Sequence, residues 1–170
     1  MPLPLPHLGP LALGLTVAVL YDLGWRRIPN AISGFVFVAA IALRGHDQGA
    51  WAAFSGVGAA ALVVAALYRP WLMGGIGGGD VKLAAATAAW VPFVRLPWFV
   101  LSGALAGGLF AVVYYVRART ATKAEIRTNL TLAVLQSELP AVPSHRAGHV
   151  SLPYSLAIAA GASAVFLFIP

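Results

Sequence analysis

Two long runs without any Asp, Glu, Lys or Arg, residues 48–68 and 96–116, limit what this chain can fold into. Each run has the length of about 20 residues that a helix needs to cross the hydrocarbon core of a bilayer. Only 9% of the 170 residues are charged and 60% are hydrophobic, whereas soluble domains carry about 25% charged residues. The sequence therefore predicts a multi-span membrane protein and excludes a water-soluble globule.

Every apolar run is predicted to be a helix, because a bilayer offers no water to unpaired backbone groups. We expect an all-α fold, a single integral membrane domain over residues 1–170 with six membrane-spanning helices. The predicted spans are 8–23, 29–43, 50–68, 79–94, 97–116 and 152–169. The second and fourth are short, and short spans flanked by Gly or Pro are typical of helices that line a cavity.

The eleven Lys and Arg residues are divided unevenly between the two sides of this predicted bundle. Arg44 and Arg95 fall on one side. The other nine fall on the opposite side: Arg26, Arg27, Arg69, Lys82, Arg117, Arg119, Lys123, Arg127 and Arg146. Short cytoplasmic loops carry the excess of basic residues, so the second side is predicted to be cytoplasmic. We therefore interpret the net charge of +6 as a sign of how the chain is oriented in the membrane. The expected partner is the lipid bilayer and not nucleic acid.

The one long connection, residues 117–150, is predicted to lie on the cytoplasmic side. Its residues Ile126, Leu130 and Val134 recur at helical spacing against a charged face, which is typical of an amphipathic helix at the membrane surface. Such a helix would cover a cytoplasmic cavity. A helix facing water, or a partly disordered loop, is the alternative.

Two of the five acidic residues, Asp22 and Asp80, do not fall in the predicted connecting segments. Asp22 ends the first predicted span and Asp80 begins the fourth, so both are expected at similar depth on the cytoplasmic side. A carboxylate within a membrane costs roughly 2.5 to 3.5 kcal/mol on insertion scales, and such residues are functional candidates. We therefore predict that the two side chains meet in a functional site.

Two adjacent carboxyl groups share one proton, because they do not readily ionise together. The ionised group takes a proton from the water that attacks an amide carbonyl, and the protonated group donates to the carbonyl oxygen. This chemistry requires no cofactor and no metal ion, and a chain without Cys has no thiol nucleophile. The pair therefore predicts an aspartic peptidase.

Other roles for the two aspartates remain open from the residues alone. Asp22 would pair with Arg26 if its helix continues that far. Asp80 would be the N-cap of a helix that starts at Val81, and backbone N–H groups would then make it the basic partner. Intramembrane carboxylates are also found in ion-coupled transporters and in noncatalytic assembly subunits.

Glycine occupies five of the six positions 74–79 in front of Asp80. We predict that Gly77, Gly78 and Gly79 leave the backbone open to an extended substrate beside that carboxyl. A flexible linker is the alternative. Lys82 is predicted to attract an acidic group of the substrate or to anchor the span at the lipid headgroups.

Several motifs are similar to those of one family. Residues 77–80 form G-x-G-D and are followed by V-K-L, Asp22 is followed by I-P-N at 28–30, and L-P-Y at 152–154 precedes the last span. Together they resemble the type IV prepilin peptidases, membrane aspartic peptidases that cut the leader from pilin and pseudopilin precursors at the cytoplasmic face of the inner membrane. The resemblance implies that Asp22 and Asp80 are catalytic and that the partner is a membrane-bound prepilin or pseudopilin.

The chain differs from the larger members of that family, which carry a cysteine-rich insertion and methylate the new amino terminus. It has no Cys and no room between its first spans, so N-methyltransferase activity is not expected. It is most similar to the short peptidases of Tad-type pilus systems. Presenilin and signal peptide peptidase share Y-D and G-x-G-D and are the second enzyme hypothesis, although their Pro-Ala-Leu motif is not found here.

Overall fold

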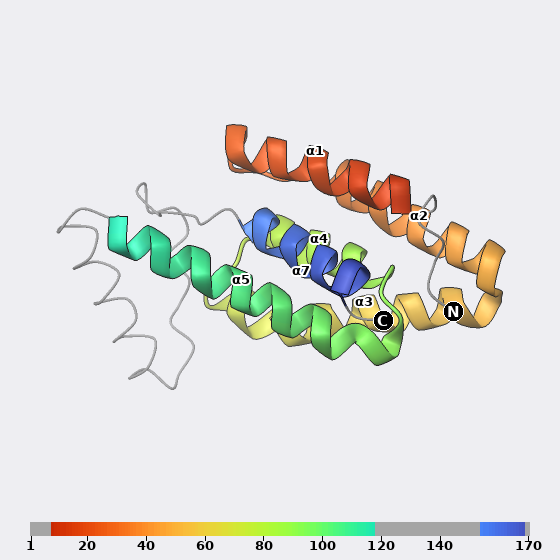
Figure 1. The fold of residues 1–170 in the computed structure, drawn as a ribbon. Helices are drawn as coiled ribbons and strands as arrows, with labels where there is room; N and C mark the ends of the chain where they lie inside the picture. Colours follow the sequence, from red (N-terminus) through yellow and green to blue (C-terminus); the bar gives the residue numbers. More distant parts are fainter. Residues whose placement is uncertain (1–7, 118–153, 169–170) are drawn as a thin grey trace.

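The computed structural model describes residues 8–117 and 154–168, and within these two ranges it contains helices and no strands (Figure 1). The elements are α1 (Gly9–Trp25), α2 (Asn30–Gln48), α3 (Ala50–Leu72), α4 (Gly78–Ala88), the 3-10 helix η2 (Phe93–Arg95), α5 (Leu96–Arg117) and α7 (Tyr154–Phe168). The predicted all-α class is confirmed. Apart from Arg117, the predicted amphipathic segment lies outside the described residues.

Two helical segments are long and apolar enough to cross a membrane. They are Ala50–Leu72 and Phe93–Arg117, each with a mean hydropathy of 1.9. Gly9–Trp25 and Tyr154–Leu167 are apolar but shorter. Each of the six expected spans contains an α-helix, whereas membrane crossing by all six stays a prediction.

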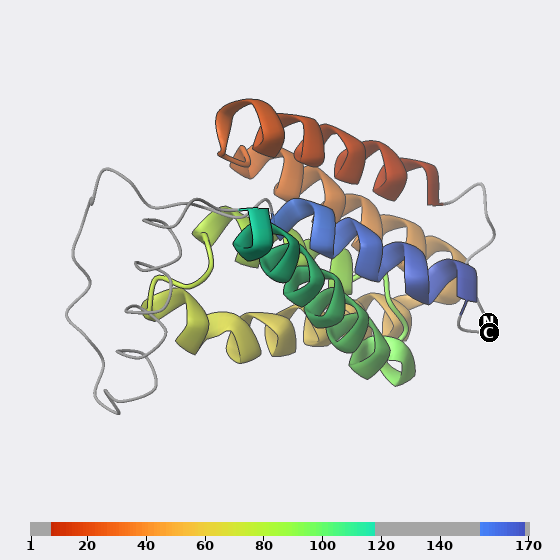
Figure 2. The ribbon, with the colours of Figure 1, turned by 60° about the vertical axis from the view of Figure 1, so that its left-hand side comes forward.

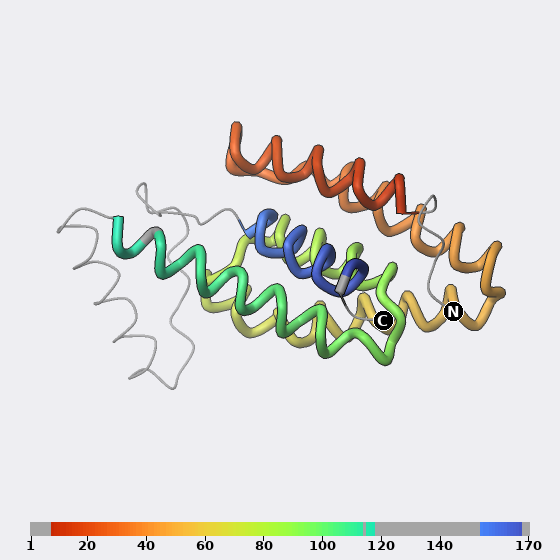
Figure 3. Tube along the Cα trace, viewed as in Figure 1, coloured from red at the N-terminus to blue at the C-terminus, as the bar shows by residue number. Residues whose placement is uncertain are grey.

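Successive helices run in opposite directions, so that alternate helix ends meet at the same end of the bundle (Figures 1 and 2). The end of α1 and the beginnings of α2, α4 and α7 lie together, at the left of Figure 1. The short helix α4 contacts α2, α3 and α7, and α7 contacts α1, α4 and α5 (Figure 3). The centre of the bundle is thus built from α4 and α7.

Local sequence explains where the helices stop and start at the end of the bundle where α1 ends and α2, α4 and α7 begin. After α1 the backbone of Arg26 turns into the left-handed region, with φ of 52°, and its N–H donates to the carbonyl of Asp22 at 2.9 Å. Pro29, with φ of −59° and ψ of 136°, is the N-cap residue that directly precedes α2. Gly74, with φ of 71°, turns the chain after α3, a conformation that favours glycine.

The prediction that the second span is short and ends before Arg44 is wrong. Helix α2 has 19 residues and runs to Gln48, and the Arg44 side chain is only 4% exposed. Its guanidinium donates to the carbonyls of Ala89 and Val91 at 2.7 and 3.2 Å, and to Ser55 Oγ at 3.0 Å. A cation at the end of α4 satisfies carbonyls that a helix leaves unpaired, so Arg44 joins α2, α3 and α4.

The fully buried Trp90 holds the same end of α4, since its indole N–H donates to the carbonyl of Val36 in α2 at 2.9 Å. Nearly all residues of α4 from Val81 to Ala88 are buried. The fourth span is short, as predicted, with 11 residues. Arg44 and Trp90 therefore fix the far end of the helix that carries Asp80 at its beginning.

Candidate active site

Asp22 and Asp80 line one open cavity of about 790 Å³ at the end of the bundle where α1 stops and α4 starts, and we call it the polar cavity. Besides the two aspartates its lining residues are Tyr21, Trp25, Arg26, Arg27, Ile28, Pro29, Asn30, Gly77, Gly78 and Gly79. The charges of the two carboxyl groups interact. The structure thus brings together two acidic side chains that lie far apart in the sequence.

The Asp22 carboxyl is held by the first turn of α7. Ser155 Oγ donates to Asp22 Oδ2 at 2.6 Å, and the backbone N–H of Ser155 approaches the same oxygen at 3.4 Å. Asp22 itself is 9% exposed. Its carboxyl group therefore has a hydrogen-bond donor in Ser155, whereas the sequence pointed only to Arg26 as a partner.

Asp80 lies in the first turn of α4 but is not its N-cap. The helix begins at Gly78 and is preceded by Gly77 as N-cap, so the alternative in which Asp80 caps a helix starting at Val81 is wrong, whereas the predicted span start at residue 79 is close. Glycine destabilises the interior of a helix, but Gly78 and Gly79 lie in the first turn of α4. The N–H groups of a first turn have no partner within the helix. Backbone groups of Gly77 and Asp80 itself interact with the carboxyl. Its Oδ1 atom is buried and has no hydrogen-bond partner among the described residues.

The three glycines before Asp80 are packed closely, each against a different group. A Cβ atom on Gly77 would lie 2.7 Å from Asp80 Oδ2, and one on Gly79 would lie 3.3 Å from Ile28 Cβ. A Cβ on Gly78 would lie 3.3 Å from the Trp71 indole nitrogen. The absence of a side chain at Gly77 thus makes room for the carboxyl of Asp80 itself.

Lys82 does not line the polar cavity. It is exposed, and its Nζ donates to Asn30 Oδ1 at 2.9 Å. This bond joins the first residue of α2 to α4, the helix that carries Asp80. Contact of Lys82 with a substrate or with headgroups stays a prediction.

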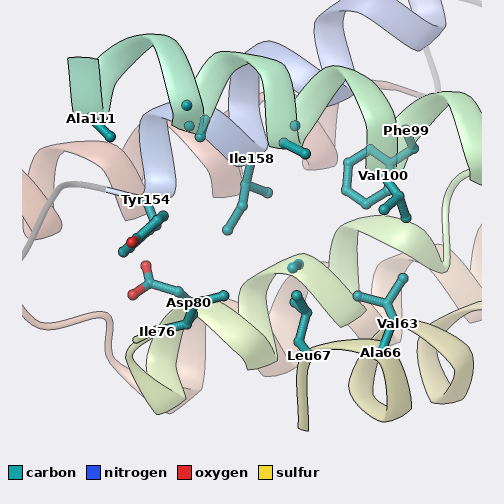
Figure 4. Close-up of a pocket in the computed structure, with 16 residues that line it drawn as sticks. Val63, Ala66, Leu67, Ile76, Asp80, Phe99, Val100, Ala111, Tyr154 and Ile158 are labelled. Carbon is teal, nitrogen blue, oxygen red and sulfur yellow. The ribbon is translucent and has the colours of Figure 1, made fainter. Parts of the chain in front are cut away.

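A second cavity, of about 360 Å³, lies on the other side of Asp80, and we call it the apolar slot. Figure 4 shows it between α3 and α4 on one side and α5 and α7 on the other. Apart from Asp80 and Tyr154, its lining is made of the apolar residues Val63, Ala66, Leu67, Ile76, Ala84, Phe99, Val100, Gly103, Ala104, Gly107, Gly108, Ala111, Ala157 and Ile158. Asp80 therefore stands at the boundary between a polar and an apolar cavity.

Tyr154, the first residue of α7, points its hydroxyl group toward the Asp80 carboxyl (Figure 4), and the two groups interact electrostatically. Sequence reasoning assigned no site role to Tyr154 or Ser155. Tyr154 belongs to the L-P-Y motif, which was a possible signal. Nothing in the sequence marks Ser155, because an uncharged serine at the start of an apolar run is unremarkable in hydropathy.

Residues 10–112, which include both aspartates, match the model of the type IV leader peptidase family. No curated protein and no solved structure matched. The family match covers more than half of the chain and agrees with the resemblance seen in its motifs. The chain therefore belongs to the type IV leader peptidase family.

Proposed function

We propose that this chain is a multi-pass inner-membrane aspartic endopeptidase that removes the basic leader from a type IV prepilin or pseudopilin precursor at the cytoplasmic face. The observation that carries the proposal is that Asp22 and Asp80 line one cavity. Family membership supports the peptidase activity. Family membership does not give the substrate, the catalytic pair or the orientation in the membrane, and these belong to the proposal.

The hydrogen bonds favour different roles for the two carboxyl groups. Asp22 accepts the Ser155 hydrogen bonds, as suits a carboxylate acting as base. Asp80 Oδ1 has no donor within the described residues, so we place the shared proton there. Asp22 takes a proton from water as the water oxygen bonds to the scissile carbonyl carbon, and Asp80 donates to the carbonyl oxygen. The C–N bond then breaks as Asp22 returns the proton to the leaving nitrogen and Asp80 takes a proton back from a hydroxyl group of the intermediate, which becomes the new carboxyl group and restores both side chains.

The position of Asp80 between two cavities fits a precursor in which a polar leader is joined to an apolar helix. The polar cavity would take the residues around the scissile bond, and the apolar slot would take side chains that follow it. The slot has room for a few side chains, not for a whole helix. The rest of that helix would lie against the exposed apolar surface of α5, on which Leu105, Leu109 and Val112 are more than half exposed.

The proposed orientation rests on the ends of the helices. Arg26 follows α1, Arg69 lies in the last turn of α3, and Arg117 ends α5. Because successive helices alternate in direction (Figure 1), these bases share the end of the bundle that holds the polar cavity. The excess of bases supports a cytoplasmic location for that end.

The proposal is tested with the purified chain in lipid vesicles and a synthetic precursor carrying a basic leader, Gly before the cut and an apolar helix. We expect hydrolysis into two fragments, identified by mass spectrometry, and no methylation of the new amino terminus. A matched peptide with a polar sequence in place of the apolar helix should be cut poorly. A folded chain that leaves the first precursor intact would exclude the proposed activity and favour a transporter or an assembly subunit.

Filling the apolar slot should weaken substrate binding. Gly108 lines the slot, and a Cβ atom there has no neighbour within 4 Å, so Gly108→Leu has room for its Cβ atom and adds a side chain to the lining of the slot. We expect KM to rise about tenfold with kcat nearly unchanged. Contacts between the slot and the substrate that are equally strong in the ground state and in the transition state affect only KM. Initial rates over a range of precursor concentrations measure both constants.

The matched control for this variant is Gly34→Leu in α2, another exposed helical glycine without a neighbour within 4 Å. Both substitutions raise helix propensity, so neither should reduce folding. Equal KM values for the two variants would show that the slot does not bind the precursor.

A further inference from the structure

The hydroxyl group of Ser155 donates to a carboxyl side chain, whereas several other helical hydroxyl groups of the bundle donate to backbone carbonyls. The hydroxyl groups of Thr16, Thr87, Ser102 and Ser163 each donate to the carbonyl four residues earlier in their own helix. Ser155 is the second residue of α7 and has no such carbonyl within its helix. Its hydroxyl group, fully buried, instead donates to Asp22 across a sequence separation of 133 residues.

The geometry of this contact restrains the Asp22 carboxyl group. Asp22 lies in the last turn of α1, next to the left-handed residue Arg26 that ends the helix. The Ser155 hydroxyl and N–H groups both face its Oδ2 atom, at 2.6 and 3.4 Å. A hydrogen bond to a charged acceptor is shorter and stronger than one between neutral groups. Two donors on one oxygen therefore hold the side chain in one orientation.

Helix α7 also faces the second carboxyl group. Tyr154, which directly precedes Ser155, points toward Asp80 (Figure 4), and α7 contacts both α1 and α4. The first turn of α7 thus connects the helix that carries Asp22 with the helix that carries Asp80. A displacement of this turn would change how the two carboxyl groups face each other.

We infer that Ser155 is a positioning residue, whose hydroxyl group fixes Asp22 Oδ2 so that the other oxygen, Oδ1, faces the attacking water. The inference rests on the proposed function, because it assigns Asp22 to the catalytic pair. Ser155 lines neither the polar cavity nor the apolar slot. It therefore acts on the chemical step through Asp22 and leaves substrate binding unchanged.

The test compares Ser155→Ala with wild type in the vesicle assay. Without the hydroxyl group the Asp22 side chain gains rotational freedom, and small misplacements of a reacting group are costly in rate. We expect kcat to fall about tenfold while KM stays the same. Ser155→Thr, which keeps the hydroxyl group, should recover most of kcat per folded molecule.

Ser163→Ala on the same helix is the matched control, because the Ser163 hydroxyl group bonds only within α7. It should retain the wild-type kcat. An unchanged kcat in Ser155→Ala, or a fall in apparent kcat that disappears when the rate is divided by the amount of folded protein, would overturn the inference while wild-type cleavage still supported the proposed function. If wild type itself does not cleave, the proposed function and this inference fall together.

Discussion

Asp22→Asn and Asp80→Asn are each expected to abolish leader cleavage while the chain still inserts and folds. One general acid or base typically contributes about 10²- to 10⁴-fold to a rate. In the proposed reaction each carboxyl group either donates or accepts a proton in both halves of the cycle, and an amide does neither. We therefore expect losses at the upper end of this range, below the detection limit of most cleavage assays.

Folding should survive these substitutions. Asn has nearly the size of Asp, and its carbonyl oxygen can still accept the hydrogen bond that Ser155 donates to position 22. Either change also removes the repulsion between two interacting carboxyl groups. Membrane extraction, elution volume and thermal unfolding in detergent should match wild type.

The measurement is appearance of the leader fragment over time, with Asp47→Asn as the control. Asp47 is an exposed carboxyl near the end of α2 and does not line the polar cavity. Its variant should cleave at the wild-type rate. The double variant Asp22→Asn/Asp80→Asn should be no worse than either single one, because residues that act as a unit are not additive. Full cleavage by either single variant would refute the catalytic pair.

The helices and the two aspartates were predictable because both depend on strong local signals. An apolar run must pair its backbone within itself, and two carboxyl groups at span ends are conspicuous where only 9% of residues are charged. That Asp22 and Asp80 lie at the same end of the bundle followed from counting alternating spans. Hydropathy and topology were sufficient for these conclusions.

The errors arose where a long-range contact decided the local structure. Arg44 was taken as the end of a span, but it is buried because the carbonyls of Ala89 and Val91 accept its hydrogen bonds. Ser155 was missed because its partner is 133 residues away. Neither contact leaves a periodic pattern in the sequence. Hydrogen bonds from polar side chains to backbone or carboxyl groups far away in the sequence could therefore not be predicted from the sequence.

Gly77→Ala is expected to lower kcat about a hundredfold without unfolding the chain. The backbone of Gly77 has φ of −69° and ψ of 143°, which alanine adopts without strain. The added Cβ atom would lie 2.7 Å from Asp80 Oδ2, closer than van der Waals contact allows. Because a carboxyl group is the movable end of its side chain, Asp80 should shift and the backbone should not.

The size of the loss follows from the displacement. A misplacement of a reacting group by about 1 Å costs on the order of 10²-fold in rate. Alanine also restricts the unfolded chain more than glycine does, so thermal stability should be unchanged or slightly higher. The expected result is a folded enzyme with a low kcat, measured by cleavage assay and thermal unfolding on the same preparation.

Gly34→Ala is the matched control for this substitution, since a Cβ atom there meets nothing within 4 Å, and it should retain full activity. Wild-type cleavage by Gly77→Ala would mean that the Asp80 carboxyl tolerates displacement or is not a reacting group. The Asp80→Asn variant separates these two explanations. If Gly77→Ala is active and Asp80→Asn is not, the carboxyl reacts from a position other than the one it occupies without substrate, and substrate binding must move it.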